Sequence, residues 1–279
     1  MKVLFVADFF REQLAGGGES NDNNLINFLN SNGVLVVKKN SSDITTSDVS
    51  QYEKIIIGNF ILLSSAVREA LCKAQNYIIY EHDHKYLTTR DPSKYNNFVI
   101  PANQRINVQF YERAQRVVVL SRICAQILKN TIPEATIHNI GCSLWSPETL
   151  GYISSLRGVT KNHDYCILKS SNPTKNYIKT REFCTSKGIK PLEIHNPDYY
   201  EFLRLMSTAK SFIFLPTVLE TFSRVCAEAK MLNLEVRTIK NLIGFYSEDY
   251  SNLQGSPLTD KILEKNQMAY EYFYNWVTT

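Results

Sequence analysis

Two glutamates, Glu220 and Glu228, stand eight positions apart in LPTVLETFSRVCAEA, directly behind a strand-like apolar run. If helical, that stretch spans about 12 Å, enough for two carboxylates to contact separate parts of one extended ligand. The amides of Thr221, Phe222 and Ser223 would lie between them at a helix N-terminus, where free N–H groups and the helix dipole favour an anion. This order suits a sugar, a diphosphate and ribose hydroxyls. The alternative is a helix cap at Glu220 and a solvated helix residue at Glu228.

A second polar group, His82, Asp83 and His84, follows the strand-like YIIYE. Two histidines without a third defined ligand make a poor zinc site, so we predict no metal here. In a parallel sheet, this position is at the carboxyl edge, where ligands bind. The alternatives are a hydrogen-bonded turn and a stray pair of metal ligands.

The glycines Gly16, Gly17 and Gly18 follow the first apolar run. They lack both the Gly-Lys-Ser/Thr of a P-loop and the three-glycine spacing of dinucleotide-binding proteins. The second strand ends in Lys38 and Lys39, where a nicotinamide enzyme would place an acid for the ribose. A dehydrogenase is therefore disfavoured, and by itself the glycine run could be only a flexible turn.

The elements that must position these residues follow an α/β pattern in a chain of 279 residues, enough for two domains. Hydrophobic residues make up 44% and charged residues 21%, as in a folded globular protein. We expect no signal peptide and no membrane span. The six cysteines form no Cys-x-x-Cys pair, which indicates reduced thiols in a cytoplasm.

Short β-branched runs alternate with amphipathic stretches along the whole chain. In the first half one helix is expected to be capped by Ser20 and to stop at Gly33. Predicted strands are 3–7, 34–38, 54–57, 77–80, 116–120, about 135–140, 164–169, 190–194, 211–215 and 234–237. Predicted helices in the second half are 174–187, 198–209, 222–232 and a terminal helix in 257–279.

The stretch 141–162 collects Gly, Ser and Pro, as a connection between domains would. We therefore predict two Rossmann-like, doubly wound domains, 1–145 and 146–279, with the terminal helix in the second. Their ligands are expected in a cleft between the carboxyl ends of the strands.

With these motifs in place, the sequence resembles the GT-B glycosyltransferases, in particular glycosyltransferase family 4. FLPTVLETFSRVCAEAKML is similar to the strand, Pro, first Glu, Phe and second Glu of that family, and YCILKSSNPTKN to the strand and loop that carry its lysine. The resemblance implies that Glu220 contacts the transferred sugar, Glu228 the nucleotide ribose and Lys175 the donor diphosphate.

The resemblance extends to the first half, where VADFFREQLAGGGES is similar to the family's glycine-rich first loop. It implies that Gly16, Gly17 and Gly18 belong to the donor site and that His82 and Asp83 hold donor and acceptor hydroxyls. The chain departs from the family where Lys169, Ser170 and Ser171 replace the usual basic residue, and where Thr221-Phe222-Ser223 replaces Gly-Phe-Gly. Ser170 is included among the candidate donor contacts.

The expected chemistry is transfer of a hexosyl group from a UDP-sugar, with no cofactor beyond this co-substrate. The leaving diphosphate needs stabilisation that Lys175 and helix amides supply without a metal. An inverting enzyme would also need a base, for which Asp83 is the candidate. A retaining enzyme, as family 4 members generally are, would not.

The segment between His84 and Arg116 is basic and aromatic in a chain of net charge +4. Such residues suit a phosphate-bearing polymer, although a solvated face over buried rings is an equal alternative. Size and domain plan resemble the T-even phage enzymes that glucosylate hydroxymethylcytosine in DNA, especially those adding a second glucose. This resemblance implies a double-stranded DNA acceptor, with predicted contacts from Lys85, Arg90, Lys94 and Arg105. Alternatives are a surface-polysaccharide glycosyltransferase and a non-catalytic nucleotide-sugar-binding module.

Overall fold

The computed structural model describes residues 1–279 and divides into two compact units. One comprises Met1–Leu144 with Lys265–Thr279, and the other Trp145–Glu264. The first break lies one residue from the predicted boundary, but the chain end joins the first unit rather than the predicted second domain, 146–279. Its aromatic side chains explain why: Tyr270 stacks on Phe28 at 4.5 Å between ring centroids, and the Phe273 ring lies 5.0 Å from that of Tyr80.

The first unit is built on a six-stranded parallel sheet of order β2-β1-β3-β4-β5-β6. Each strand overlaps a predicted β-branched run. The middle strands β3 and β4 are buried at every residue, which is typical of strands covered by helices on both faces. The strands are β1 (Lys2–Ala7), β2 (Leu35–Asn40), β3 (Ile55–Ile57), β4 (Tyr77–Tyr80), β5 (Arg116–Val119) and β6 (Ile137–Asn139).

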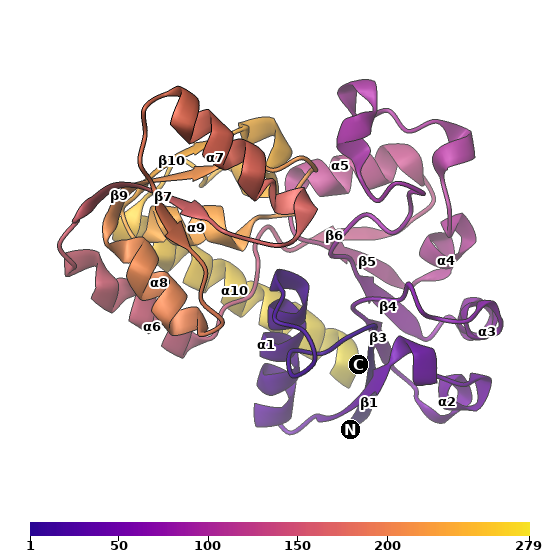
Figure 1. Ribbon diagram of the computed structural model, residues 1–279. Helices are drawn as coiled ribbons and strands as arrows, with labels where there is room; N and C mark the ends of the chain where they lie inside the picture. Colours follow the sequence, from indigo (N-terminus) through magenta and orange to yellow (C-terminus); the bar gives the residue numbers. More distant parts are fainter. The chain divides into compact units, whose positions relative to one another are not determined.

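Helices cover both faces of this sheet, with α1 and the end of α10 on one side and α2, α3 and α4 on the other (Figure 1). Because side chains along β4 alternate between the two faces of the sheet, β4 contacts helices on both sides. Tyr77 stacks on Phe110 of α4, and Tyr80 faces Phe273 of α10. The helices are α1 (Gly17–Ser31), α2 (Thr46–Gln51), α3 (Ser65–Ala74), α4 (Val108–Arg113), α5 (Arg122–Thr131) and α10 (Gly255–Thr278), whose last part belongs to this unit.

Helix α1 begins three residues before the predicted cap. Ser20 lies within the first turn, where its hydroxyl donates to the carbonyl of Gly16 at 2.7 Å. Gly16 is the N-cap, so two glycines of the glycine run form the start of the helix. The helix ends at Ser31, and Gly33 follows with a φ of 80° that favours glycine.

The second unit has a four-stranded parallel sheet of order β10-β9-β7-β8. Its α7 packs on one face, where Cys184 contacts Ile167 of β7 and Ile213 of β9. Figure 1 shows α7 on one side of these strands and α6 and α8 on the other. The elements are β7 (His163–Leu168), β8 (Leu192–Ile194), β9 (Ala209–Phe214), β10 (Glu235–Thr238), α6 (Pro147–Ser155), α7 (Tyr177–Ser186), α8 (Tyr199–Ser207) and α9 (Arg224–Met231).

The stretch 141–162, predicted to be a connection, contains helix α6. Ser146 caps it by accepting a hydrogen bond from the amide of Thr149 at 3.2 Å, and Pro147 occupies the first turn. Serine followed by proline is a common helix start, so the residues that suggested a linker are those that begin this helix.

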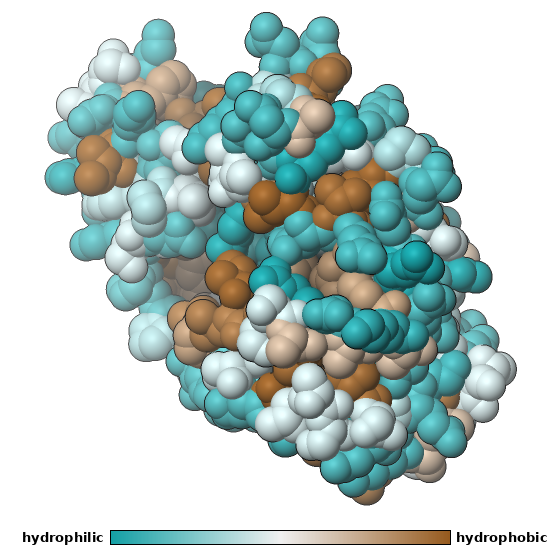
Figure 2. Space-filling view, turned by 90° about the vertical axis from the view of Figure 1, so that its right-hand side faces the viewer, coloured by the Kyte–Doolittle hydropathy of each residue, from teal (hydrophilic) through white to brown (hydrophobic).

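No helix of the protein is both long and apolar enough to cross a bilayer. Figure 2 shows a face on which hydrophilic residues predominate and apolar residues form small, separate patches. Such scattered apolar residues are normal for a protein surface.

Candidate functional site

The candidate donor residues of the second unit lie where the strand order reverses. Strand β7 pairs with β8 on one side and with β9 on the other, so the carboxyl ends of β7 and β9 flank a topological switch point. The loop after β7 carries Lys175, and the loop after β9 carries Glu220. Parallel topology therefore brings together two residues 45 positions apart.

Lys175 and Glu220 form a bidentate ion pair. The Lys175 ammonium lies 2.7 and 2.8 Å from the two carboxylate oxygens, and the side chains are 30% and 12% exposed. The backbone of Glu220 is fixed, since its amide donates to Leu242 and its carbonyl accepts from Gly244, both at 2.9 Å. A cation and a carboxylate thus stand together, partly exposed and on rigid backbone.

The residues between the two glutamates have different environments. Ser223 has a φ of 71° and is the N-cap of α9, with no side-chain capping bond. Phe222 is 1% exposed, and its ring packs against those of Trp145 and Phe245. The Phe222 side chain is therefore a core residue and not a donor contact, because the aromatic cluster encloses it. Anion binding by the amides of 221–223 stays a prediction.

Glu228 is 1% exposed and lies in an internal cluster rather than on an open ligand surface. Its Oε1 accepts a hydrogen bond from Trp145 Nε1 at 2.9 Å and another from the Tyr199 hydroxyl, and Arg224 Nε lies 3.6 Å away. The Arg224 guanidinium also stacks on Trp145, 4.4 Å from its ring centroid. Burial, followed by the Glu228 charge, raises the pKa of Tyr199. Any ribose contact by Glu228 must be made from within this cluster.

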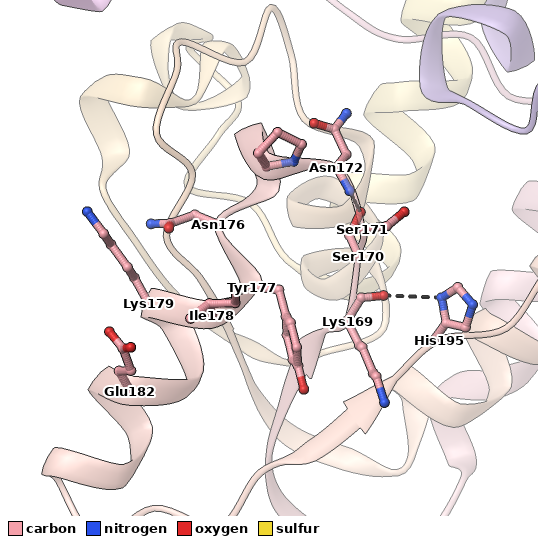
Figure 3. A pocket seen from close by; sticks show the side chains of 11 residues that line it. Lys169, Ser170, Ser171, Asn172, Asn176, Tyr177, Ile178, Lys179, Glu182 and His195 are labelled. Carbon is pink, nitrogen blue, oxygen red and sulfur yellow. Dashed lines mark hydrogen bonds between the residues drawn. The ribbon is translucent and has the colours of Figure 1, made fainter.

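A cavity of about 730 Å³ opens at the carboxyl ends of β7 and β8 (Figure 3). Ser170, a predicted donor contact, lines it with Tyr177 of α7 and His195, which follows β8. His195 Nδ1 lies 3.2 Å from the carbonyl of Lys169, and Tyr177 donates to Glu193 at 2.5 Å. Neither His195 nor Tyr177 was among the predicted site residues. The signal for His195 was its position, a polar residue directly after a strand at the ligand edge.

In the first unit, the glycine run lies against His82. A Cβ atom added at Gly18 would lie 3.4 Å from Cγ of His82, so the helix start packs directly on the imidazole. His82 Nε2 lies 2.8 Å from Oδ1 of Asp22 on α1, a residue that the sequence analysis did not select. The adjacent His84 is buried and bonded to the Tyr86 hydroxyl at 3.0 Å. The glycine run and His82 therefore belong to one local arrangement.

Asp83 is held between two cations. Its Oδ1 accepts from Lys85 Nζ at 2.6 Å, and its Oδ2 pairs with Arg90. Lys85 also donates to the buried Glu81 at 3.0 Å, and Tyr111 donates to the other oxygen of Glu81. Burial alone would raise the pKa of Glu81, but Lys85 and Tyr111 hold it below its usual value.

Of the four predicted DNA contacts, Lys85 is internal and Arg105 is half-buried. Lys85 is 2% exposed because the Glu81 and Asp83 carboxylates hold its ammonium inside the fold. The guanidinium of Arg105 donates to the carbonyls of Ile100 and Thr131, both at 3.0 Å. The Lys85 prediction is wrong, since its charge is not available to a polymer, whereas the contact by the half-buried Arg105 stays a prediction. Lys94 is exposed, as are Arg90, Arg113 and Arg116.

Glu19, in the first turn of α1, gives a pH-dependent prediction. Burial raises the pKa of its carboxyl above the usual value. A raised carboxyl pKa contributes stability that is fully present below the unfolded-state pKa and is lost as pH rises through the folded-state pKa. We therefore expect Glu19→Gln to be more stable than the parent at pH 7, with the difference disappearing near pH 4. Urea unfolding between pH 4 and 8 measures it.

Glu182→Gln on the exposed part of α7 is the matched control and should leave the pH dependence unchanged. A parent protein that gains stability relative to Glu19→Gln between pH 4 and 7 would contradict the burial argument.

No protein-family model and no curated protein matches the sequence, whereas several solved structures match the fold. An alpha-glucosyltransferase in complex with UDP-glucose and DNA containing an abasic site has a TM-score of 0.54 at 12% identity, over 100% of this chain and 99% of that chain. An alpha-glucosyltransferase with UDP and a 13-mer DNA containing an HMU base has a TM-score of 0.52 at 12% identity, over 99% of this chain and 95% of that chain. Anabaena Alr3699/HepE in complex with UDP has a TM-score of 0.58 at 14% identity, over 99% of this chain and 100% of that chain.

These matches run over nearly the whole of each chain. The α/β fold with two parallel, Rossmann-like sheets is therefore shared with these solved structures, as the resemblance to GT-B enzymes predicted. At 12–14% identity they define the fold, and function must be argued from the residues themselves.

Proposed function

We propose that the protein is a glucosyltransferase that moves glucose from UDP-glucose to an acceptor hydroxyl. The observation that carries the proposal is the Lys175–Glu220 pair at the β7/β9 switch point, 2.7 Å apart and partly exposed. A cation for a leaving diphosphate and a carboxylate for sugar hydroxyls are the groups that such a donor requires. The fold is shared with enzymes whose structures contain UDP or UDP-glucose.

In this proposal Lys175 and the amides of 221–223 stabilise the negative charge that develops on the diphosphate. Glu220 accepts hydrogen bonds from the transferred sugar, and Ser170 lies on the donor side. His82 and Asp83 hold hydroxyl groups. Because both Asp83 oxygens are paired with cations, this carboxylate suits positioning better than proton transfer.

Lys175 and the amides of 221–223 stabilise the charge on the diphosphate in this proposal. The reaction therefore requires no metal ion and no cofactor other than the UDP-sugar itself. No group of three or more His, Cys, Asp or Glu side chains is arranged to hold a metal ion. We also place the protein in a cytoplasm, where its six free cysteines stay reduced.

The test is incubation with UDP-[¹⁴C]glucose and four acceptors: DNA with glucosylated hydroxymethylcytosine, unmodified DNA, a lipid-linked oligosaccharide, and none. Label in an acceptor, or free glucose in its absence, supports the proposal, and both should persist in EDTA. Binding of UDP without any turnover would instead identify a non-catalytic binding module.

For the acceptor we propose double-stranded DNA carrying hydroxymethylcytosine, already glucosylated. Support comes from the exposed cations Arg90, Lys94, Arg113 and Arg116, and from a fold shared with an enzyme bound to DNA. Each phosphate contact releases counterions on binding. We expect Lys94→Ala to reduce the slope of log Kd against log salt by about 0.9. Fluorescence anisotropy with labelled DNA between 50 and 300 mM salt measures it.

The matched control is Lys187→Ala, an exposed lysine of the second unit, which should keep the parent slope. Donor hydrolysis should be unchanged in both variants. If unmodified and modified DNA both remain unlabelled at low salt while the oligosaccharide is labelled, the acceptor is a surface polysaccharide. The burial of Lys85 favours this second candidate.

A further inference from the structure

The imidazole of His82 is held in one orientation by its surroundings. Tyr80 points to the side of the sheet that carries α1, and His82, two residues later, points to the same side. The two rings lie 4.3 Å apart at 62°, an edge-to-face contact. Gly18 leaves space beside the ring, since a Cβ atom added there would meet His82 at van der Waals distance. Packing therefore sets the ring plane and leaves the position of its proton to its hydrogen-bond partners.

The carboxylate of Asp22 faces that ring from α1. The Asp22 and His82 side chains are 3% and 8% exposed, and Oδ1 lies 2.8 Å from Nε2. Gly58, directly after β3, makes room for the carboxylate, since a Cβ there would lie 2.4 Å from Oδ2. Any other residue at position 58 would displace Asp22. Residues from three separate segments thus hold the Asp22 carboxylate against Nε2 of His82.

A carboxylate can only accept, so the nitrogen that faces it must donate. We propose that Asp22 is a positioning residue that keeps the proton of His82 on Nε2, so that Nδ1 is the unprotonated nitrogen in the neutral ring. This inference rests on the proposed function for the role of His82 in holding substrate hydroxyls. The tautomer decides whether Nδ1 accepts a hydrogen bond or donates one.

A purely structural role for Asp22, tying α1 to the sheet, gives different expectations. It would affect stability without changing kcat in the folded protein. The tautomer role affects kcat through a ring that stays in place. Asp22→Asn separates the two, because the amide is nearly isosteric and its NH₂ group can donate to Nε2, which moves the ring proton to Nδ1.

Two measurements test the inference. In ¹⁵N-histidine-labelled protein, with the His82 signals assigned by loss in His82→Asn, long-range ¹H–¹⁵N spectra identify the protonated nitrogen. We expect Nε2–H in the parent and Nδ1–H in Asp22→Asn. In the transfer assay, kcat of Asp22→Asn should fall about 10²-fold with an unchanged KM for UDP-glucose, the usual effect of removing one preorganised hydrogen bond from a transition state.

Asp48→Asn is the matched control. Asp48 is 6% exposed, lies in the same unit and is paired with Lys39 at 2.6 Å, so it also loses a largely buried carboxylate charge. Its kcat and the His82 tautomer should be unchanged.

A parent spectrum with Nδ1–H overturns the inference, and so does a folded Asp22→Asn that keeps the parent tautomer or the parent kcat. If Asp22→Asn does not fold, the parent spectrum alone decides the tautomer. Absence of transfer and donor hydrolysis in the parent, with Nε2–H confirmed, rejects the proposed function and leaves Asp22 as the residue that sets the ring tautomer.

Discussion

Lys175→Met should transfer glucose about 10²–10³-fold more slowly than the parent, the usual effect of removing one charge-stabilising donor from a transition state. Methionine keeps the length of the side chain and removes its charge. The ammonium that pairs with Glu220 at 2.7 Å is, in the proposed reaction, the group that meets the leaving diphosphate. The effect should appear in kcat at saturating UDP-glucose, measured as initial rates of label transfer and of donor hydrolysis.

Lys179→Met is the control, because this lysine lines the neighbouring cavity, is exposed on α7 and loses the same charge. Its rates should stay within a factor of two or so of the parent, as for an exposed charge without a buried partner. Equal losses in both variants would mean that general charge, and not the position of Lys175, assists the reaction. An unchanged kcat in Lys175→Met would remove this residue from the diphosphate role.

The ion pair between Lys175 and Glu220 does not argue against ligand binding by these residues. Lys175 is 30% exposed, and an ion pair with so much solvent access contributes about 1 kcal/mol or less to stability. A diphosphate can replace the carboxylate as the partner of the ammonium at little energetic cost. Glu220 then becomes available to sugar hydroxyls, so one rearrangement would prepare both residues.

The sheets could be predicted because parallel strands are buried on both faces and need continuous apolar, β-branched runs. The residues of β3 and β4 are such runs, and few other structures accommodate Ile-Ile-Ile or Tyr-Ile-Ile-Tyr. The Lys175–Glu220 contact followed from topology, since parallel strands bring their carboxyl ends to one edge. Periodicity therefore placed the loops of Lys175 and Glu220 at one edge of the sheet. The choice of Lys175 came from the resemblance to GT-B enzymes, and donor binding by both residues stays a prediction.

The irregular segment between β4 and β5 could not be predicted in the same way. It contains residues with positive φ, among them His84, Arg90 and Asn107, so the chain turns here without a periodic signal that tells which side chains are buried. Counting charges over this segment treated Lys85 and Arg105 as surface cations, although both are held by internal acceptors. A buried lysine needs a buried partner of opposite charge, and Glu81, four positions before Lys85, is such a partner.

Asp22 and Trp145 were missed for a related reason. In the sequence, Asp22 is one of several polar residues on an Asn-rich helix. The position of its carboxylate depends on the space left by Gly58, 36 positions away. Trp145 lay in a stretch interpreted as a linker, yet it donates to Glu228 over 83 positions. Long-range polar contacts between single residues leave no local pattern.

Glu228→Ala should destabilise the second unit by about 3 kcal/mol, because it removes the partner of a largely buried cation. The carboxylate is 1% exposed and accepts from Trp145 and Tyr199, and the Arg224 side chain is 11% exposed. A solvated helix residue, the alternative from the sequence, would change stability by no more than about 0.5 kcal/mol. In a Trp276→Phe background, Trp145 is the remaining tryptophan, and its emission during urea unfolding reports on this unit.

The exposed Glu182→Ala in the same background is the control and should unfold like the parent. Arg224→Met combined with Glu228→Gln completes a double-mutant cycle, and its coupling energy separates the ion pair from the hydrogen bonds of Tyr199 and Trp145. Glu228→Gln keeps an acceptor oxygen, so it should remain folded enough for calorimetry with UDP. If its UDP affinity falls tenfold or more while its stability is near the parent's, Glu228 does contact the ribose from within the cluster. If stability falls and affinity holds, Glu228 serves here to fix Arg224 and Tyr199 at the start of α9 rather than to contact the ribose.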